Sequence, residues 1–268
     1  MDALVATGLW TRIASFEGSA DAFNAPFTAV SADPKLVARF AQCSFDRIAV
    51  AGSDRLALSK LESELSACLA ERGVGGEGRT ALEQMCHLQQ IVRALRSESS
   101  DGSVAVLEVG FNEGHSACAI LAARPDVCVV SFDIGKHASV AVAKAFVDAR
   151  FPGRHQLIVG DSTTSVPSYE PARRCRDGTV AFEICFIDGG HALEVARADL
   201  SNCARLARVV IMDDLDPAVF WGRGPSEAWA EAIDDGRIVD EALYECSVAP
   251  GEGPRRAWGV GTFARGEG

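Results

Sequence analysis

Short, mainly apolar runs recur from residue 104 onward. They consist mainly of Val, Ile, Leu, Phe and Ala, and they lie at 104–109, 127–132, 155–160, 183–187 and 208–212. Strands that are apolar on both faces are typical of parallel sheets covered by helices on both sides, whereas half-exposed strands alternate. The pattern therefore predicts parallel strands in the interior of one domain.

Helical periodicity fills the segments between these runs. The predicted helices lie at 115–125, 138–151, 191–207 and 224–236. Two further runs, 237–249 and 255–265, are separated by a glycine-rich turn and predict an antiparallel pair at the sheet edge. We expect an α/β fold: a Rossmann-like, seven-stranded, mostly parallel sheet with an antiparallel edge hairpin and helices on both faces.

The first hundred residues have a different pattern. Residues 1–53 are rich in turn-forming residues, with a short helix expected within 32–42, and longer helices are expected at 53–73 and 80–98. We expect residues 1–100 to be an N-terminal irregular and helical extension that caps a pocket or makes a dimer contact. The remaining residues, 101–268, are expected to form the main domain.

The segment "LEVGFNEGHSA", 107–117, joins the first apolar run to the first helix. Gly110 permits a tight turn at the strand end, and Gly114 lets the helix pack closely. The spacing G-x-x-x-G differs from the G-x-G-x-x-G of dinucleotide binders. Glu108 would repel a pyrophosphate and suits an ammonium or sulfonium group, which counts against NAD or FAD.

The pattern E-x-G-x-x-x-G-x-S-A resembles the first motif of class I S-adenosylmethionine-dependent methyltransferases, and is most similar to the catechol O-methyltransferase type. The resemblance implies the Rossmann-like fold and S-adenosylmethionine as cofactor. It also implies that the cofactor contacts Glu108, Gly110, Phe111, Asn112, Gly114 and Ser116. An ordinary strand–turn–helix with tolerated glycines is the alternative.

Acidic residues end the next strands as well. Asp133 follows the second apolar run, and Asp161 and Ser162 follow the third. The resemblance implies that Asp133 accepts both ribose hydroxyls and that Asp161 and Ser162 face the adenine rim. Helix capping is the alternative for each acid taken singly. Their recurrence favours a binding edge, because ligands of open α/β sheets bind at the carboxyl ends of the strands.

The fourth and fifth strands carry Asp188, Asp213 and Asp214 to the same edge. Neighbouring strands lie about 4.8 Å apart, so these carboxylates are expected to converge and to repel one another. A hard divalent cation, Mg²⁺ or else Mn²⁺ or Ca²⁺, would remove the repulsion. The Asp-Asp pair and the segment "IDGGH" resemble macrolide sugar O-methyltransferases more than the catechol type. Helix capping is again the alternative role for these three acids.

His191 lies three residues beyond Asp188. In the families that the chain resembles, a lysine or histidine at this place takes the proton from the substrate hydroxyl. A histidine suits that role near neutral pH, and a metal or substrate contact or no chemical role are the alternatives. Further along, Phe220, Trp221 and Trp229 are expected to form an apolar wall over the substrate, or else to pack the edge hairpin.

Composition narrows the remaining choices. The net charge of -11 opposes binding of nucleic acid, and no apolar run is long enough to span a membrane. Nine cysteines without a C-x-x-C pair indicate reduced thiols and a cytoplasmic protein. The sequence thus predicts a Mg²⁺-dependent O-methyltransferase of a small-molecule hydroxyl, with a homodimer left open. The alternatives are a metal-independent N- or O-methyltransferase, a nucleotide-dependent oxidoreductase and a non-catalytic cofactor-binding protein.

Overall fold

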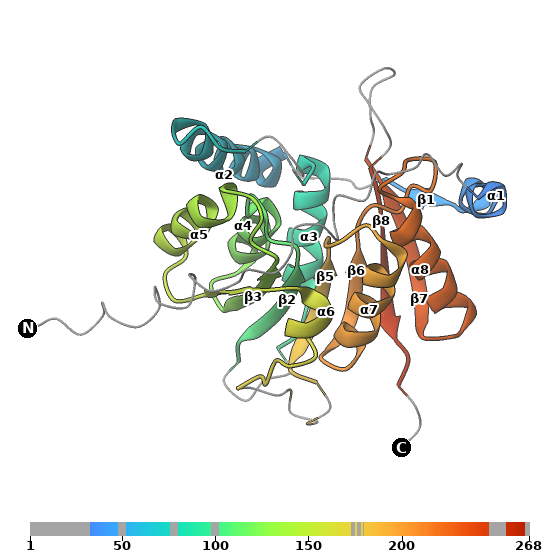
Figure 1. The fold of residues 1–268 in the computed structure, drawn as a ribbon. Helices are drawn as coiled ribbons and strands as arrows, with labels where there is room; N and C mark the ends of the chain where they lie inside the picture. Colours follow the sequence, from blue (N-terminus) through green and yellow to red (C-terminus); the bar gives the residue numbers. More distant parts are fainter. Residues whose placement is uncertain are drawn as a thin grey trace, which may run out of the picture. The chain divides into compact units, whose positions relative to one another are not determined.

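The computed structural model describes residues 33–47, 52–75, 80–97, 102–172, 175, 178, 180–246 and 256–265. Residues Ala32–Gly268 form one compact unit (Figure 1). Most of the irregular segment expected at 1–53 lies outside the described residues. Among the helices that the structure describes, none combines the length and apolar character needed to cross a membrane.

The described strands form one sheet in the order β1-β7-β8-β6-β5-β2-β3-β4. Their bounds are Phe45–Asp46 (β1), Val104–Val109 (β2), Val127–Asp133 (β3), His155–Val159 (β4), Phe182–Ile187 (β5), Ala207–Met212 (β6), Ile238–Glu245 (β7) and Ala257–Phe263 (β8). All pairings are parallel except those of β8, which runs antiparallel to both β6 and β7. The predicted α/β class and the antiparallel edge pair are confirmed.

The sheet has eight described strands where the sequence predicted seven. The additional strand, β1, pairs Phe45 with Leu243 and Asp46 with Tyr244 at the outer edge of β7. Two residues are too few to show alternation, so this strand leaves no periodic signal in the sequence.

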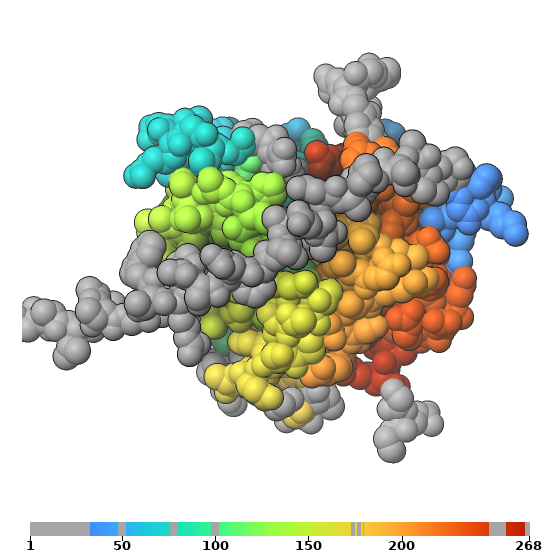
Figure 2. All heavy atoms as spheres, viewed as in Figure 1, coloured from blue at the N-terminus to red at the C-terminus, as the bar shows by residue number. Residues whose placement is uncertain are grey.

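Helices cover both faces of the sheet. One face is covered by α2 (Gly52–Glu71), α3 (Leu82–Ala94), α4 (His115–Ala123) and α5 (Ser139–Arg150). The other carries α1 (Pro34–Gln42), the short α6 (Ser162–Ser165), α7 (Leu193–Ala204) and α8 (Arg223–Asp234). Helix α2 forms an outer layer against α4 and α5, and Figure 2 shows it lying on α5.

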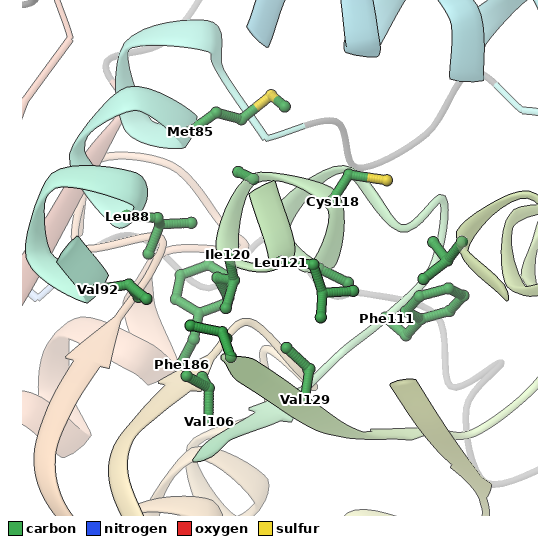
Figure 3. Packing of buried hydrophobic residues seen from close by; sticks show 14 of the residues in the cluster. Met85, Leu88, Val92, Val106, Phe111, Cys118, Ile120, Leu121, Val129 and Phe186 are labelled. Carbon is green, nitrogen blue, oxygen red and sulfur yellow. The ribbon is translucent and has the colours of Figure 1, made fainter. Parts of the chain in front are cut away.

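Buried aliphatic side chains fill the space between α3, α4 and the sheet. Figure 3 shows Leu88 and Val92 of α3 directed toward α4, with Ile120 of α4 above Val106 of β2. Each of these side chains is no more than 1% exposed. Helix α3 of the N-terminal extension therefore shares a hydrophobic core with α4 and the sheet.

Strand register aligns the carboxyl ends of four central strands. Val109 of β2 lies opposite Phe132 of β3 and opposite Ile187 of β5, and Ile187 in turn lies opposite Met212 of β6. The residues that follow these positions are Gly110, Asp133, Asp188 and Asp213. The parallel sheet thus gathers one glycine turn and three acids along a single edge, as the sequence predicted.

Candidate active site at the carboxyl edge of the sheet

The glycine turn after β2 is held tightly against the turn after β5. Gly110 has φ +93°, and a Cβ atom at this position would lie 1.8 Å from the carbonyl oxygen of Asp188. Gly114 also has a positive φ and is the N-cap of α4, and a Cβ atom added there would lie close to Ala143 and to the ring of Phe111. Glycine is required at Gly110 for both conformation and space.

Substitution of Gly110 by Ala tests this requirement. We expect Gly110→Ala to abolish binding of S-adenosylhomocysteine, because the added methyl group displaces the turn that would contact the cofactor. The measurement is isothermal calorimetry together with the thermal unfolding midpoint.

Gly102→Ala is the matched control, since Gly102 also has positive φ but no atom within 4 Å of the added Cβ. It should cost about 1 kcal/mol of stability and leave binding intact. Equal binding by both variants would contradict the role given to Gly110.

Asp133 organises the same turn. Its Oδ2 accepts hydrogen bonds from the backbone N–H groups of Phe111 (3.0 Å) and Asn112 (2.8 Å), and its Oδ1 accepts one from Gly135 (2.7 Å). A carboxylate has about four acceptor positions, so most of them are taken by the backbone. The predicted ribose acceptor thus lies at the expected strand end and also fixes the glycine turn.

Glu108 lies beneath the turn and does not face solvent. The residue is 0% exposed, and its two carboxylate oxygens accept hydrogen bonds from the hydroxyls of Ser116 (2.6 Å) and Ser131 (2.5 Å). Burial raises its pKa to about 7, and the two serine hydroxyls oppose that rise. Both carboxylate oxygens of Glu108 are thus occupied by serine hydroxyls, and the contacts of Glu108 and Ser116 with the cofactor stay predictions.

Asp161 is the N-cap of α6. Its Oδ1 accepts hydrogen bonds from the backbone N–H (2.9 Å) and the hydroxyl (2.7 Å) of Thr163, while Ser162 begins the helix. The capping alternative is thus realised for Asp161, which stays exposed at the end of β4. Two exposed apolar side chains that the sequence did not single out lie at the ends of β3 and β4. They are Ile134 (41% exposed) and Val159 (60% exposed). The sequence signal that could have identified them is an apolar residue at the end of a strand, where the chain leaves the sheet.

Asp188, His191 and Asp214 come together at the ends of β5 and β6. Each offers one ligand atom, and these atoms lie within 4.8 Å of one another. His191 Nε2 is 2.9 Å from Asp214 Oδ2. A cavity of about 10 Å³ is lined by these three side chains and by the glycines after Asp188, which is room for one water or one ion.

Asp213 lines the same cavity but is not one of these three residues, and its predicted role as a metal ligand stays a prediction. It is 4% exposed, and its Oδ1 accepts a hydrogen bond from the backbone N–H of Asp214 (2.7 Å). Asp214 has φ +59°, an uncommon conformation for a residue with a side chain. This backbone turn directs Asp214 toward His191 and leaves Asp213 buried.

The acids at this edge disfavour each other's ionised forms. Burial and the neighbouring Asp213 and Asp214 raise the pKa of Asp188 well above its usual range. Burial, followed by Asp214, raises the pKa of Asp213 to about 7. Positive charge supplied to this cluster would therefore be strongly stabilising.

Two residues from distant parts of the chain support the acids. The charge of Arg256, just before β8, opposes the rise in the pKa of both Asp188 and Asp213. The fully buried side chain of Gln84 in α3 opposes the rise in the pKa of Asp213, although neither of its polar atoms has a hydrogen-bond partner in the described part of the chain. Both residues lie far from Asp188 and Asp213 in the sequence, so no local motif could have identified them.

The aromatic residues expected over the substrate divide into two groups. Phe220 is 55% exposed and Trp221 is half-buried, with their rings edge to face at 4.8 Å. Trp229 is 1% exposed in the core, where its ring lies against Gly259 and its Nε1 donates to Glu241. The expectation that Trp229 lines the substrate pocket is wrong, because the buried face of α8 carries it into the hairpin packing.

Comparisons with known proteins agree with this geometry. Residues 107–215 match a family model described as a methyltransferase domain. That segment spans the glycine turn and the acids Asp133, Asp188, Asp213 and Asp214. A search of curated proteins found no match.

Solved structures show the same fold. An O-methyltransferase from Bacillus cereus in complex with S-adenosylhomocysteine is 16% identical, with a TM-score of 0.55, over 80% of this chain and 92% of that chain. The O-methyltransferase TomG from Streptomyces achromogenes, in complex with S-adenosylmethionine, is 16% identical, with a TM-score of 0.56, over 86% of this chain and 96% of that chain.

Residues 107–215, which hold the glycine turn and the acids at the carboxyl edge of the sheet, thus match a methyltransferase domain. The fold of the chain is similar to those of solved O-methyltransferases.

Proposed function

We propose that the protein is a divalent-metal-dependent O-methyltransferase that acts on a hydroxyl of a small molecule with two neighbouring oxygens, such as a catechol, a sugar diol or another natural product. The main support for this proposal is the group of Asp188, His191 and Asp214, whose ligand atoms lie within 4.8 Å of one another. Carboxylates and one imidazole fit a hard or borderline ion such as Mg²⁺ or Mn²⁺.

The donor set supports an ion here for a second reason. Burial and the neighbouring acids raise the pKa values of Asp188 and Asp213, so the cluster lacks sufficient positive charge of its own. In this proposal Asp188 and Asp214 hold the ion, while Asp213 fixes the backbone of Asp214. When bound, the ion supplies positive charge that lowers the pKa of the substrate hydroxyl.

His191 is the proposed base. Its Nε2 lies 2.9 Å from Asp214 Oδ2, so the carboxylate orients the ring. His191 takes the hydroxyl proton, and the substrate oxygen attacks the methyl carbon of the cofactor. The oxygen–carbon bond forms as the carbon–sulfur bond breaks, and the sulfonium becomes the neutral thioether of S-adenosylhomocysteine.

The cofactor lies along the remaining edge in this proposal. Asp133 accepts a ribose hydroxyl with its remaining acceptor capacity, Ile134 and Ser162 border the adenine, and Asp188 takes the ammonium group. Phe220 and Trp221 form an apolar wall over the substrate, which their exposure permits.

Calorimetry with S-adenosylhomocysteine, in EDTA and in Mg²⁺ or Mn²⁺, tests the proposal. We expect micromolar binding, about -8 kcal/mol, followed by methylation of vicinal diols that stops in EDTA. Absence of S-adenosylhomocysteine binding would contradict the cofactor site, and activity that survives EDTA would contradict the metal.

A metal-independent methyltransferase is the second candidate, because one observation favours it. The His191–Asp214 pair needs no ion, and the raised pKa values of Asp188 and Asp213 allow protons to relieve the acidic cluster. Activity in EDTA with the same substrates would identify this candidate.

A further inference from the structure

A buried chain of hydrogen bonds continues from the glycine turn across two further strands. Ser131 of β3 donates its hydroxyl proton to Glu108 Oε2, and the Nε2 atom of His155 in β4 lies 2.9 Å from the same Ser131 oxygen. At the other end, Ser116 of α4 donates to Glu108 Oε1. The chain therefore runs His155–Ser131–Glu108–Ser116 and joins three strands to the first turn of α4.

The proton count fixes the tautomer of His155. A serine hydroxyl has one proton. When Glu108 is ionised, Ser131 gives that proton to Glu108, so Nε2 of His155 donates to the Ser131 oxygen. The Nδ1 atom meets no hydrogen-bond partner in the described part of the chain. Burial, helped by Lys144, lowers the pKa of His155 to about 4, which keeps the ring neutral at pH 7.

The same imidazole supports the glycine turn from below. Its ring stacks on Phe111, with centroids 4.9 Å apart and an interplanar angle of 25°. Phe111 lies within the turn, where its N–H donates to Asp133 and its ring packs beneath Gly114. One side chain from β4 thus controls both a backbone position and, through Ser131 and Glu108, the direction of the Ser116 hydroxyl.

We propose that Ser131 and His155 are positioning residues for the cofactor, which act through Glu108, Ser116 and Phe111 without touching it. This inference rests on the cofactor of the proposed function and not on the metal or the substrate. A buried polar chain of this kind costs stability wherever one member lacks its partner, whereas apolar side chains would fill the same space without that cost. In this proposal, the hydrogen-bonded chain is polar because it positions the cofactor site at the glycine turn.

The first test reads the tautomer by ¹⁵N NMR of the histidine ring nitrogens, with His155→Gln used to assign the signals. We expect neutral His155 with the proton on Nε2 in the wild type, and loss of that preference in Ser131→Ala. A wild-type ring with the proton on Nδ1 would overturn the proposal.

The second test measures binding of S-adenosylhomocysteine in EDTA. We expect Ser131→Ala and His155→Leu to bind about tenfold more weakly, which is about 1.4 kcal/mol, while Ser131→Thr and His155→Gln, which keep a donor, stay within about threefold of the wild type. Ser226→Ala is the control, because Ser226 is equally buried but lies in α8.

Wild-type affinity in both Ser131→Ala and His155→Leu would overturn the proposal. Should His155→Leu fail to fold, Ser131→Ala decides the result. Absence of binding by the wild type would instead contradict the cofactor class, and a loss of diol methylation with intact binding would concern the proposed metal and base.

Discussion

Asp188→Asn is expected to produce opposite effects on stability and on activity. In EDTA the variant should unfold at a temperature a few degrees higher than the wild type, because one negative charge leaves a cluster that contains Asp213 and Asp214. A gain of about 1 kcal/mol corresponds to a shift of roughly 2–4 °C for a chain of this size. The measurement is thermal unfolding in EDTA and in millimolar Mn²⁺ or Mg²⁺.

The same variant should lose the response to metal. The wild type is expected to gain stability on addition of the ion, since a ligand that binds only the folded state raises the unfolding midpoint. Asp188→Asn should show little of that gain, and its rate of methyl transfer should fall by about 10²- to 10³-fold, because a Lewis acid contributes several kcal/mol.

Asp148→Asn is the control, since Asp148 is an exposed carboxylate on α5 that pairs with Lys144. It should respond to metal as the wild type does. Metal stabilisation that persists in Asp188→Asn would show that this carboxylate does not hold the ion.

His191→Ala separates the role of base from the role of ligand. If His191 takes the substrate proton, the rate at neutral pH should fall by about 10²- to 10⁴-fold while stabilisation by metal and binding of S-adenosylhomocysteine persist. Asp214→Asn should lose both rate and metal response, because Asp214 orients His191 and belongs to the acidic group. Steady-state rates and unfolding curves of the two variants provide the measurement.

Glu194→Gln serves as the control for His191, being an exposed acid in the first turn of α7. Its rate should match the wild type. Loss of the metal response in His191→Ala would contradict the assignment as a base alone and would make the imidazole a ligand.

The local sequence was informative wherever a signal repeats along the chain. Runs such as 104–109 are mainly apolar, and each is followed by a glycine or an acid. The sheet and the row of acids at its carboxyl edge were therefore both predictable. Ala228, Trp229 and Ala232 also follow helical spacing along one face of α8. This spacing favoured burial of Trp229 over a place in the substrate wall.

Other features left no such trace. Asp213 and Asp214 are adjacent and chemically alike, and the positive φ of Asp214 decides which of them faces His191. Strand β1 is too short to show a period. The link from Glu108 to Ser131 and His155 depends on the neighbouring positions of three strands, which sequence distance conceals.

The sequence by itself determined the class of fold, the glycine turn and the row of acids, because local patterning sets which strands are buried and parallel strands end at a common edge. Only the tertiary structure decided that Asp214 rather than Asp213 joins Asp188 and His191, that Glu108 lies beneath the turn, and that Gln84 and Arg256 support the acids. The physical reason is that side-chain direction and charge pairing depend on register, backbone torsion and long-range packing, none of which is encoded in the order of neighbouring residues.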